Sequence, residues 1–149
     1  LDGDASGASG WDIGAYEFLN EQADSDGDGM FDGWELFHFG APTNGVAALD
    51  DDGDNASNFN EFVADTGPHD PFSFFAITAI SNEPARAVGF TSSAQRNYSL
   101  FGATSLASGA WSALPPSVDC PGTGGLMFLA DTNTLTMRFY KVKVALPDP

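Results

Sequence analysis

Asp24-Ser-Asp-Gly-Asp-Gly-Met-Phe-Asp-Gly-Trp-Glu35 is the stretch that decides the fold of this chain. Its acidic residues fill places 1, 3, 5, 9 and 12 of a loop, and they are Asp24, Asp26, Asp28, Asp32 and Glu35. Alternate side chains of a tight loop point inward, so the first three carboxylates are expected to converge on one point. Gly29, at place 6, takes the sharp turn without a Cβ clash.

This spacing predicts a loop that wraps a calcium ion with oxygen atoms. The backbone carbonyl of Met30 is expected to supply one ligand, and Asp32 to act directly or through a water molecule. Glu35 is expected to close the shell with both of its carboxylate oxygens.

A second loop follows 26 residues later, with its side chains at Asp50, Asp52, Asp54, Asn58 and Glu61. The expected backbone ligand is the carbonyl of Ala56. Place 6 holds Asn55, and Asn is the residue other than glycine that best tolerates a left-handed backbone. We therefore expect two calcium ions, against the alternative of two solvated acidic loops that bind none.

Charge divides the chain into two different halves. The net charge is −16, and residues 1–71 hold 17 Asp and Glu with no Lys or Arg. Residues 72–149 hold 4 acidic residues and all 5 basic residues. Crowded carboxylates repel one another, so the acidic half is expected to need cations to become compact. No basic patch is present to neutralise phosphates, which disfavours a nucleic-acid partner.

The remaining composition bounds where the protein works. The apolar runs are too short for a membrane span, and no signal peptide is recognisable. The chain begins at Leu1, which we interpret as a processed piece of a longer polypeptide. Asp-rich loops suit millimolar calcium, so we expect an extracellular or cell-surface location. Cys120 is the single cysteine, which excludes an internal disulfide. We expect a small buried apolar side chain there, with an intermolecular partner as the alternative.

Three segments follow from the pattern: a lead-in with one extended strand over 1–21, a paired calcium loop–helix module over 22–71, and an antiparallel β-sandwich over 72–149. The extended strand is predicted at Trp11–Phe18. A short helix is predicted after each loop, the first ending at Gly40. Apolar residues at helical spacing are expected to share one buried face, and they are Met30, Trp34 and Phe37 in the first helix and Phe59, Phe62 and Val63 in the second.

The second half changes to a strand pattern, so the predicted fold is mainly β with a small α-helical calcium unit. The expected strands are 72–80, 87–91, 97–101, 110–114, 126–129 and 135–146. In the last of them, Tyr140, Val142 and Val144 fall on one face, and Lys141 and Lys143 on the other. Trp111 and Trp34 are expected in the cores of the two folded segments.

Both segments resemble parts of known secreted proteins. Asp24–Glu35, Asp50–Glu61 and the exit Asp65–Pro71 resemble the calcium-binding repeats of secreted bacterial proteins, which share their loop chemistry with EF-hand, dockerin and thrombospondin type 3 repeats. Residues 73–80, 96–98, 111 and 138–142 resemble the fibronectin-like or immunoglobulin-like β-sandwich that often ends such proteins. The resemblance implies a calcium-stabilised module of an extracellular protein.

The stretch Asp12-Ile-Gly-Ala-Tyr-Glu17 resembles the closing strand of secreted right-handed parallel β-helix proteins. It implies that a β-helix preceded this segment in the parent protein. A strand separated from its sheet needs a partner within the module or on a neighbouring molecule. Addition of this strand to the sheet edge of a second copy would build a fibre, so a homopolymer through residues 11–18 is one expectation.

The pattern favours a non-enzymatic structural role. The acidic residues outside the loops are scattered, and the two histidines, His38 and His69, show no catalytic or zinc spacing with Cys120. A second hypothesis is an accessory carbohydrate-binding or anchoring module of a secreted polysaccharide-degrading β-helix enzyme, for which Trp11 is the best candidate platform. An intracellular calcium sensor is disfavoured because the helices are short.

Overall fold

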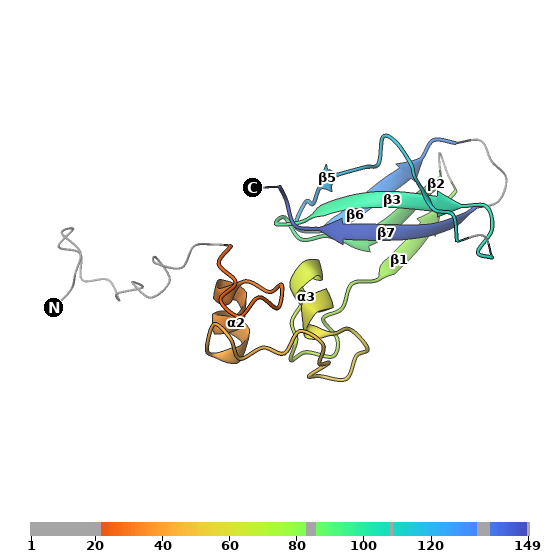
Figure 1. Ribbon diagram of the computed structural model, residues 1–149. Coiled ribbons are helices and arrows are strands. Elements are labelled where there is room, and N and C mark those ends of the chain that lie inside the picture. Colours follow the sequence, from red (N-terminus) through yellow and green to blue (C-terminus); the bar gives the residue numbers. More distant parts are fainter. Residues whose placement is uncertain (1–21, 83–85, 108, 134–137, 149) are drawn as a thin grey trace, which may run out of the picture.

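The computed structural model describes residues 22–82, 86–107, 109–133 and 138–148, so the strand predicted at Trp11–Phe18 lies outside the described residues. Two short helices precede a set of strands (Figure 1). The helices are α2 (Asp32–Phe39) and α3 (Asn58–Ala64). The strands are β1 (Ile77–Ser81), β2 (Arg86–Thr91), β3 (Asn97–Ala103), β4 (Ser112–Ala113), β5 (Cys120–Pro121), β6 (Leu126–Asp131) and β7 (Phe139–Ala145).

All strand pairs among the described residues are antiparallel, and they form two sheets. In the first sheet, β2 lies between β1 and β6. In the second, β3 pairs with β7 along its whole length, and its other edge is shared by β4 and β5. The expected mainly β fold with a small helical part is therefore confirmed. We call residues 22–66 the helical unit and residues 77–145 the β-domain.

One hydrophobic core joins the two sheets. Its buried members are Val88, Phe90 and Leu129 from the first sheet, and Tyr98, Leu100 and Leu114 from β3 and the segment after β4. The alternation predicted for the last strand is confirmed. Val142 and Val144 of β7 pack against this core opposite Leu100 and Tyr98, whereas Lys143 on the other face is exposed.

Strands β1, β4 and β5 differ from the prediction, near a turn or where only two residues pair. β1 begins at Ile77, because the stretch from Asp70 to Ser73 closes a turn in which the Ser73 N–H donates to the Asp70 carbonyl at 2.8 Å. Only Ser112–Ala113 of the strand expected over 110–114 is paired. The sequence does not predict β5, since a strand of two residues, one of them a proline, carries no alternation.

Trp111 is not a core residue, contrary to the prediction. It is half-buried, and the Nζ of Lys141 lies 4.9 Å from its ring centroid. The same ammonium lies 5.4 Å from the ring centroid of Phe101. Trp111 therefore makes a cation–π contact with Lys141. Lys141 lies on the face of β7 that points away from the core.

The helical unit is joined to the β-domain by Arg96, the residue before β3. Its guanidinium donates from Nη2 to the Phe62 carbonyl at 2.8 Å and from Nε to the Val63 carbonyl at 2.9 Å. Arg96 is only 6% exposed. The last carbonyls of a helix have no partner within the helix, so a cation that donates to them caps the end of α3.

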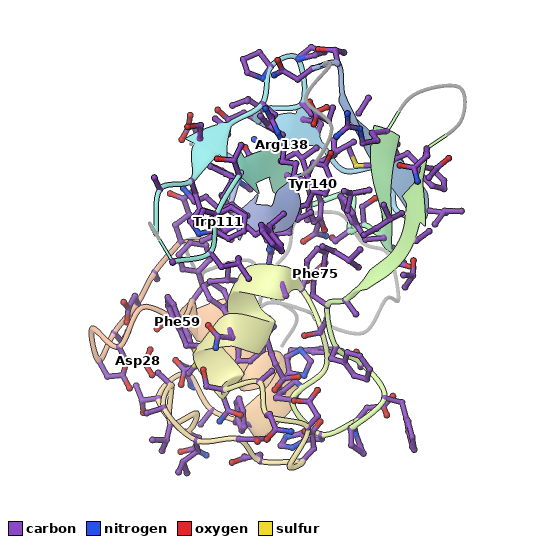
Figure 2. All side chains as sticks on the ribbon, turned by 90° about the vertical axis from the view of Figure 1, so that its right-hand side faces the viewer. Asp28, Phe59, Phe75, Trp111, Arg138 and Tyr140 are labelled. Atoms are coloured by element: carbon purple, nitrogen blue, oxygen red, sulfur yellow. The ribbon has the colours of Figure 1, made fainter. Side chains whose placement is uncertain are left out.

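Asp65 and Phe75 complete the junction. Asp65 ends α3 in the left-handed conformation, with φ 60°, and its carboxylate accepts a hydrogen bond from the Ser93 hydroxyl and lies 3.6 Å from Arg96 Nη2. Phe75 lies where α3 meets the sheets (Figure 2), and its ring contacts those of Phe90 and Tyr98 at 5.3 and 5.9 Å between centroids. The helical unit is thus seated on the β-domain by both polar and aromatic contacts.

Candidate metal sites

The first loop is shaped by its own carboxylates. Asp24 accepts hydrogen bonds from the N–H groups of Gly27 and Gly29, at 2.7 and 3.0 Å. Asp28 accepts from the N–H of Met30 at 2.9 Å. These bonds hold the backbone in a tight curve, and one oxygen from each of Asp24, Asp26 and Asp28 lies within 4.8 Å of the other two. The triplet can therefore hold a metal ion, as the spacing predicts.

The second loop repeats these bonds 26 residues later. Asp50 accepts from the N–H groups of Gly53 and Asn55, at 2.8 and 2.9 Å. Asp54 accepts from the N–H of Ala56 at 2.6 Å. Asp50, Asp52 and Asp54 again bring one oxygen each within 4.8 Å of one another. The carboxylates at places 1 and 5 thus accept hydrogen bonds from the same places in both loops, so the two loops share the same backbone curve at these places.

Glu35 and Glu61, the expected closing ligands, are not among the aspartate oxygens that lie within 4.8 Å of one another, but each is repelled by the aspartates of its own loop. Each is fully buried, Glu35 in the first turn of α2 and Glu61 in the first turn of α3. One oxygen of Glu35 accepts from the N–H of Gly45 at 2.9 Å. Burial, together with repulsion from the neighbouring aspartates, raises the pKa of both carboxyls to about 7.

Place 9 differs between the loops. Asp32 is buried, and both of its oxygens already accept hydrogen bonds from Ser25, one from the N–H and one from the hydroxyl, each at 2.7 Å. Asn58 donates from Nδ2 to the Val46 carbonyl at 3.1 Å and keeps its Oδ1 without a donor. Asp32 therefore braces its loop while each of its oxygens keeps a lone pair, as in Asp24, whereas Asn58 has an oxygen with no donor at all.

Several buried oxygens around the loops have no hydrogen-bond donor. They are Glu35 Oε2, Asp52 Oδ2, Asp54 Oδ2, Asn58 Oδ1 and both carboxylate oxygens of Glu61. A buried, unpartnered polar atom is costly, and a carboxylate more so. One hard cation in each loop would satisfy them, Glu35 Oε2 at the first loop and the other five oxygens at the second. The donor set is made of oxygen alone, which suits calcium. The residues present thus fit the ion that the spacing predicts.

The connector Gly45–Ala47 contacts both loops. Its Gly45 N–H binds Glu35 of the first loop, and its Val46 carbonyl binds Asn58 of the second. The Ala47 carbonyl also accepts from the N–H of Phe59 at 3.0 Å. A Cβ added to Gly29 would lie 2.9 Å from the ring of Phe59, so α3 packs directly on the turn of the first loop. Figure 2 shows the side chains of Asp28 and Phe59 on the same side of the helical unit.

The aromatic face of the helical unit is partly as predicted. Met30 and Phe62 are buried, and the rings of Phe31 and Trp34 meet Phe62 at 5.0 and 5.5 Å between centroids. Phe37 is wrong as a core residue, because it is 73% exposed. Phe31 takes its place, since the residue just before α2 points at α3 whereas Phe37 lies on the far face of α2.

Phe59 also differs from the prediction, being 38% exposed. It is used instead at the turn of the first loop, over Gly29. Local spacing cannot distinguish a residue that fills a core from one that covers a neighbouring loop.

The remaining candidates have packing roles. The ring of His38 stacks on Trp34 at 4.5 Å between centroids, and burial lowers the pKa of His38. The Nε2 of His69 lies 3.0 Å from the His38 carbonyl. Trp34 and Trp111 are half-buried, and Trp11, the sugar-platform candidate, lies outside the described residues.

Exchanging the residues at place 6 is expected to shift the two sites in opposite directions. Asn55 has φ 77°, a left-handed backbone that glycine adopts without cost, so Asn55→Gly is expected to raise the calcium affinity of the second site up to about fivefold, or about 1 kcal/mol. Gly29→Asn is expected to weaken the first site, because its Cβ would meet Phe59. Calorimetric titration measures both, and equal losses in the two variants would contradict the assignment.

Without metal, the helical unit is expected to become more stable as the pH falls from 7 to 4.5. The folded pKa of Glu35 and Glu61, about 7, lies above the ordinary value of 4.5, so the folded chain binds more protons between these limits. This stability is complete below pH 4.5 and is lost as the pH rises through about 7. Urea unfolding of the metal-stripped protein measures it, with Glu35→Gln/Glu61→Gln, which abolishes the trend, as the control.

Neither of the two described helices is long and apolar enough to cross a membrane. No protein-family model matches this chain, and neither a curated protein nor a solved structure matches it. The resemblances to calcium-binding repeats and to fibronectin-like domains therefore stay predictions, and the case for the metal sites depends on the loop geometry described above.

Proposed function

We propose that this chain is a non-catalytic structural module of an extracellular or cell-surface protein, stabilised by two calcium ions. The observation that carries the proposal is the set of buried oxygens without donors, which gather around both acidic loops. Asp24, Asp26, Asp28 and Glu35 would hold one ion, with Asp32 acting directly or through a water molecule. Asp50, Asp52, Asp54, Asn58 and Glu61 would hold the other.

We propose that the backbone carbonyls at place 7 of each loop, those of Met30 and Ala56, are also ligands. Their N–H groups are already tied to Asp28 and Asp54, which fixes the peptide units next to them. Asp32 takes part through the loop geometry that it holds with Ser25. Calcium supplies charge neutralisation, because it offsets the mutual repulsion of the carboxylates that converge on each loop.

We propose that the calcium-bound helical unit forms a rigid connection to the β-domain. Glu61, which would close the second loop, precedes by one and two residues the carbonyls that Arg96 holds. A closed loop therefore fixes the first turn of α3, while the β-domain fixes its last turn. We further propose that the two sheets form a fibronectin-like or immunoglobulin-like sandwich, which their antiparallel pairing and shared core support.

Isothermal titration calorimetry with calcium tests the proposal. The metal-stripped chain is expected to bind two ions, and Glu35→Gln is expected to abolish or strongly weaken one of them by removing a charge and a bidentate closure. Asp51→Asn is the matched control, because Asp51 is an exposed acid between two expected ligands and offers the same loss of charge. Unchanged binding in Glu35→Gln, or an equal loss in Asp51→Asn, would refute the ligand assignment.

A further inference from the structure

A cleft separates the helical unit from the C-terminal tail that follows β7. It has a volume of about 680 Å³. Its walls include the rings of Phe31, Trp34 and Phe62 on one side, and Leu146 and Pro147 of the tail on the other. The volume falls in the range of ligand pockets, roughly 300–1,000 Å³. The cleft is distinct from both acidic loops, since none of the expected side-chain ligands lines it.

One wall of the cleft carries an unsatisfied donor. Trp34 lines the cleft, and its indole Nε1 is buried without a hydrogen-bond partner. Buried N–H groups in folded proteins nearly always have an acceptor. The Asp65 carboxylate at the junction is already committed, because it accepts from Ser93 and faces Arg96. Because this N–H is closed off in the described structure, an occupant that brings a carbonyl or carboxylate oxygen would pair with it once the indole ring turns toward the cleft.

The chain itself supplies a candidate close to the cleft. Gln22, the first described residue, lines the cleft, and Figure 1 shows this start of the described chain on the same side of the molecule as the tail after β7. Only residues 19–21 separate Gln22 from Trp11–Phe18. A linker this short gives the attached segment an effective concentration in the millimolar range, far above that of a second molecule in dilute solution.

The composition of the segment matches the chemistry of the cleft. Trp11, Ile13, Tyr16 and Phe18 are four apolar or aromatic side chains within eight residues. The segment has no Lys or Arg, and its backbone carbonyls with Asp12 and Glu17 provide acceptors. Aromatic rings that meet at 4.5–7 Å gain energy beyond their buried area.

We propose that the cleft between α2 and the tail after β7 is the binding site for Trp11–Phe18 of the same chain. This inference concerns a part of the molecule that the calcium proposal does not use. It also assigns the predicted strand a partner within the module instead of the sheet edge of another copy. A segment bound there would tie the two ends of the described chain to the helical unit.

Disulfide trapping in the full chain tests the proposal. In a Cys120→Ser background, Tyr16→Cys is combined with Gln95→Cys, an exposed residue that lines the cleft. Asn133→Cys replaces Gln95→Cys in one control, because Asn133 is exposed on the loop after β6. Ser6→Cys, which lies ahead of the segment in the sequence, replaces Tyr16→Cys in a second control. All variants are oxidised at micromolar concentration in saturating calcium, and linkages are identified by mass spectrometry after digestion.

We expect the Tyr16–Gln95 pair to close within one molecule at least about tenfold faster than either control, following the effective-concentration argument. Equal rates in all pairs would overturn the proposal. Linkage between molecules that grows with protein concentration would also overturn it, and would assign the cleft to the segment of a second copy.

A second measurement does not depend on introduced cysteines. Trp11→Ser in the otherwise intact chain is expected to speed hydrogen exchange of the backbone amides of residues 12–18 by about tenfold or more, as seen by nuclear magnetic resonance, because loss of the largest side chain of the segment releases it from the cleft. Unchanged exchange would contradict the proposal. Calcium titration of the same variant separates this result from the metal sites, because two-ion binding is expected to persist whether the cleft proposal holds or fails.

Discussion

Removal of calcium is expected to release the helical unit while the β-domain stays folded. α2 and α3 have 8 and 7 residues, which is too short for a helix to persist on its own. At a calcium concentration about a thousand times the dissociation constant, each site would add about 4 kcal/mol to the free energy of unfolding. Without the ion, repulsion among the loop carboxylates opposes the fold instead.

Hydrogen exchange measured by mass spectrometry, before and after chelation, checks this expectation. Amides in residues 22–66 are expected to lose most of their protection, whereas those of β2 and β3, which carry buried core residues, are expected to keep theirs. Magnesium serves as the matched control, because it prefers a smaller shell of fixed octahedral geometry and is expected to restore protection poorly. Equal protection of residues 22–66 with and without calcium would contradict the proposed brace.

Arg96→Met is expected to detach α3 from the β-domain even when calcium is saturating. The substitution keeps an apolar stem and removes two charge-assisted hydrogen bonds to the Phe62 and Val63 carbonyls. Each such bond contributes roughly 1.5–3 kcal/mol, so a loss of about 3 kcal/mol in the free energy of unfolding is expected. The ring of Phe62 would also lose a guanidinium that lies 5.8 Å from its centroid.

Urea unfolding in saturating calcium measures this loss, and hydrogen exchange locates it. Arg96→Lys is the matched control, since it keeps the charge but cannot present the planar fork that reaches two carbonyls, and a smaller loss is expected. The protection of amides at the C-terminal end of α3 should fall in Arg96→Met. If it does not fall, Arg96 has no part in holding the helix.

The loops were predictable from sequence because their chemistry is local. Every side chain that shapes a loop lies within it, so the spacing of Asp24, Asp26 and Asp28 predicts their convergence. The end of α2 at Gly40 was equally local, because a glycine with φ 80° caps the helix there. Alternation in β7 also identified the face that meets the core.

The junction could not be predicted, because its partners are far apart in the sequence. Arg96 and the Phe62 carbonyl are separated by 34 positions, and nothing in the neighbourhood of either residue indicates the other. The roles of Phe37 and Phe59 could not be predicted for a related reason. Helical spacing places apolar residues on a common face, but the position of the neighbouring loop decides which of them is covered.

The connector at Gly45 and Val46 has a consequence for the proposed binding of two calcium ions. Because adjacent peptide groups hold Glu35 and Asn58, an ion in one loop would steady the peptide that holds a ligand of the other, and we expect positive coupling between the two sites. A Hill coefficient above about 1 and below about 2, the number of sites, would measure this coupling. With such coupling, the module would stiffen across a narrower interval of calcium concentration than two independent sites would give.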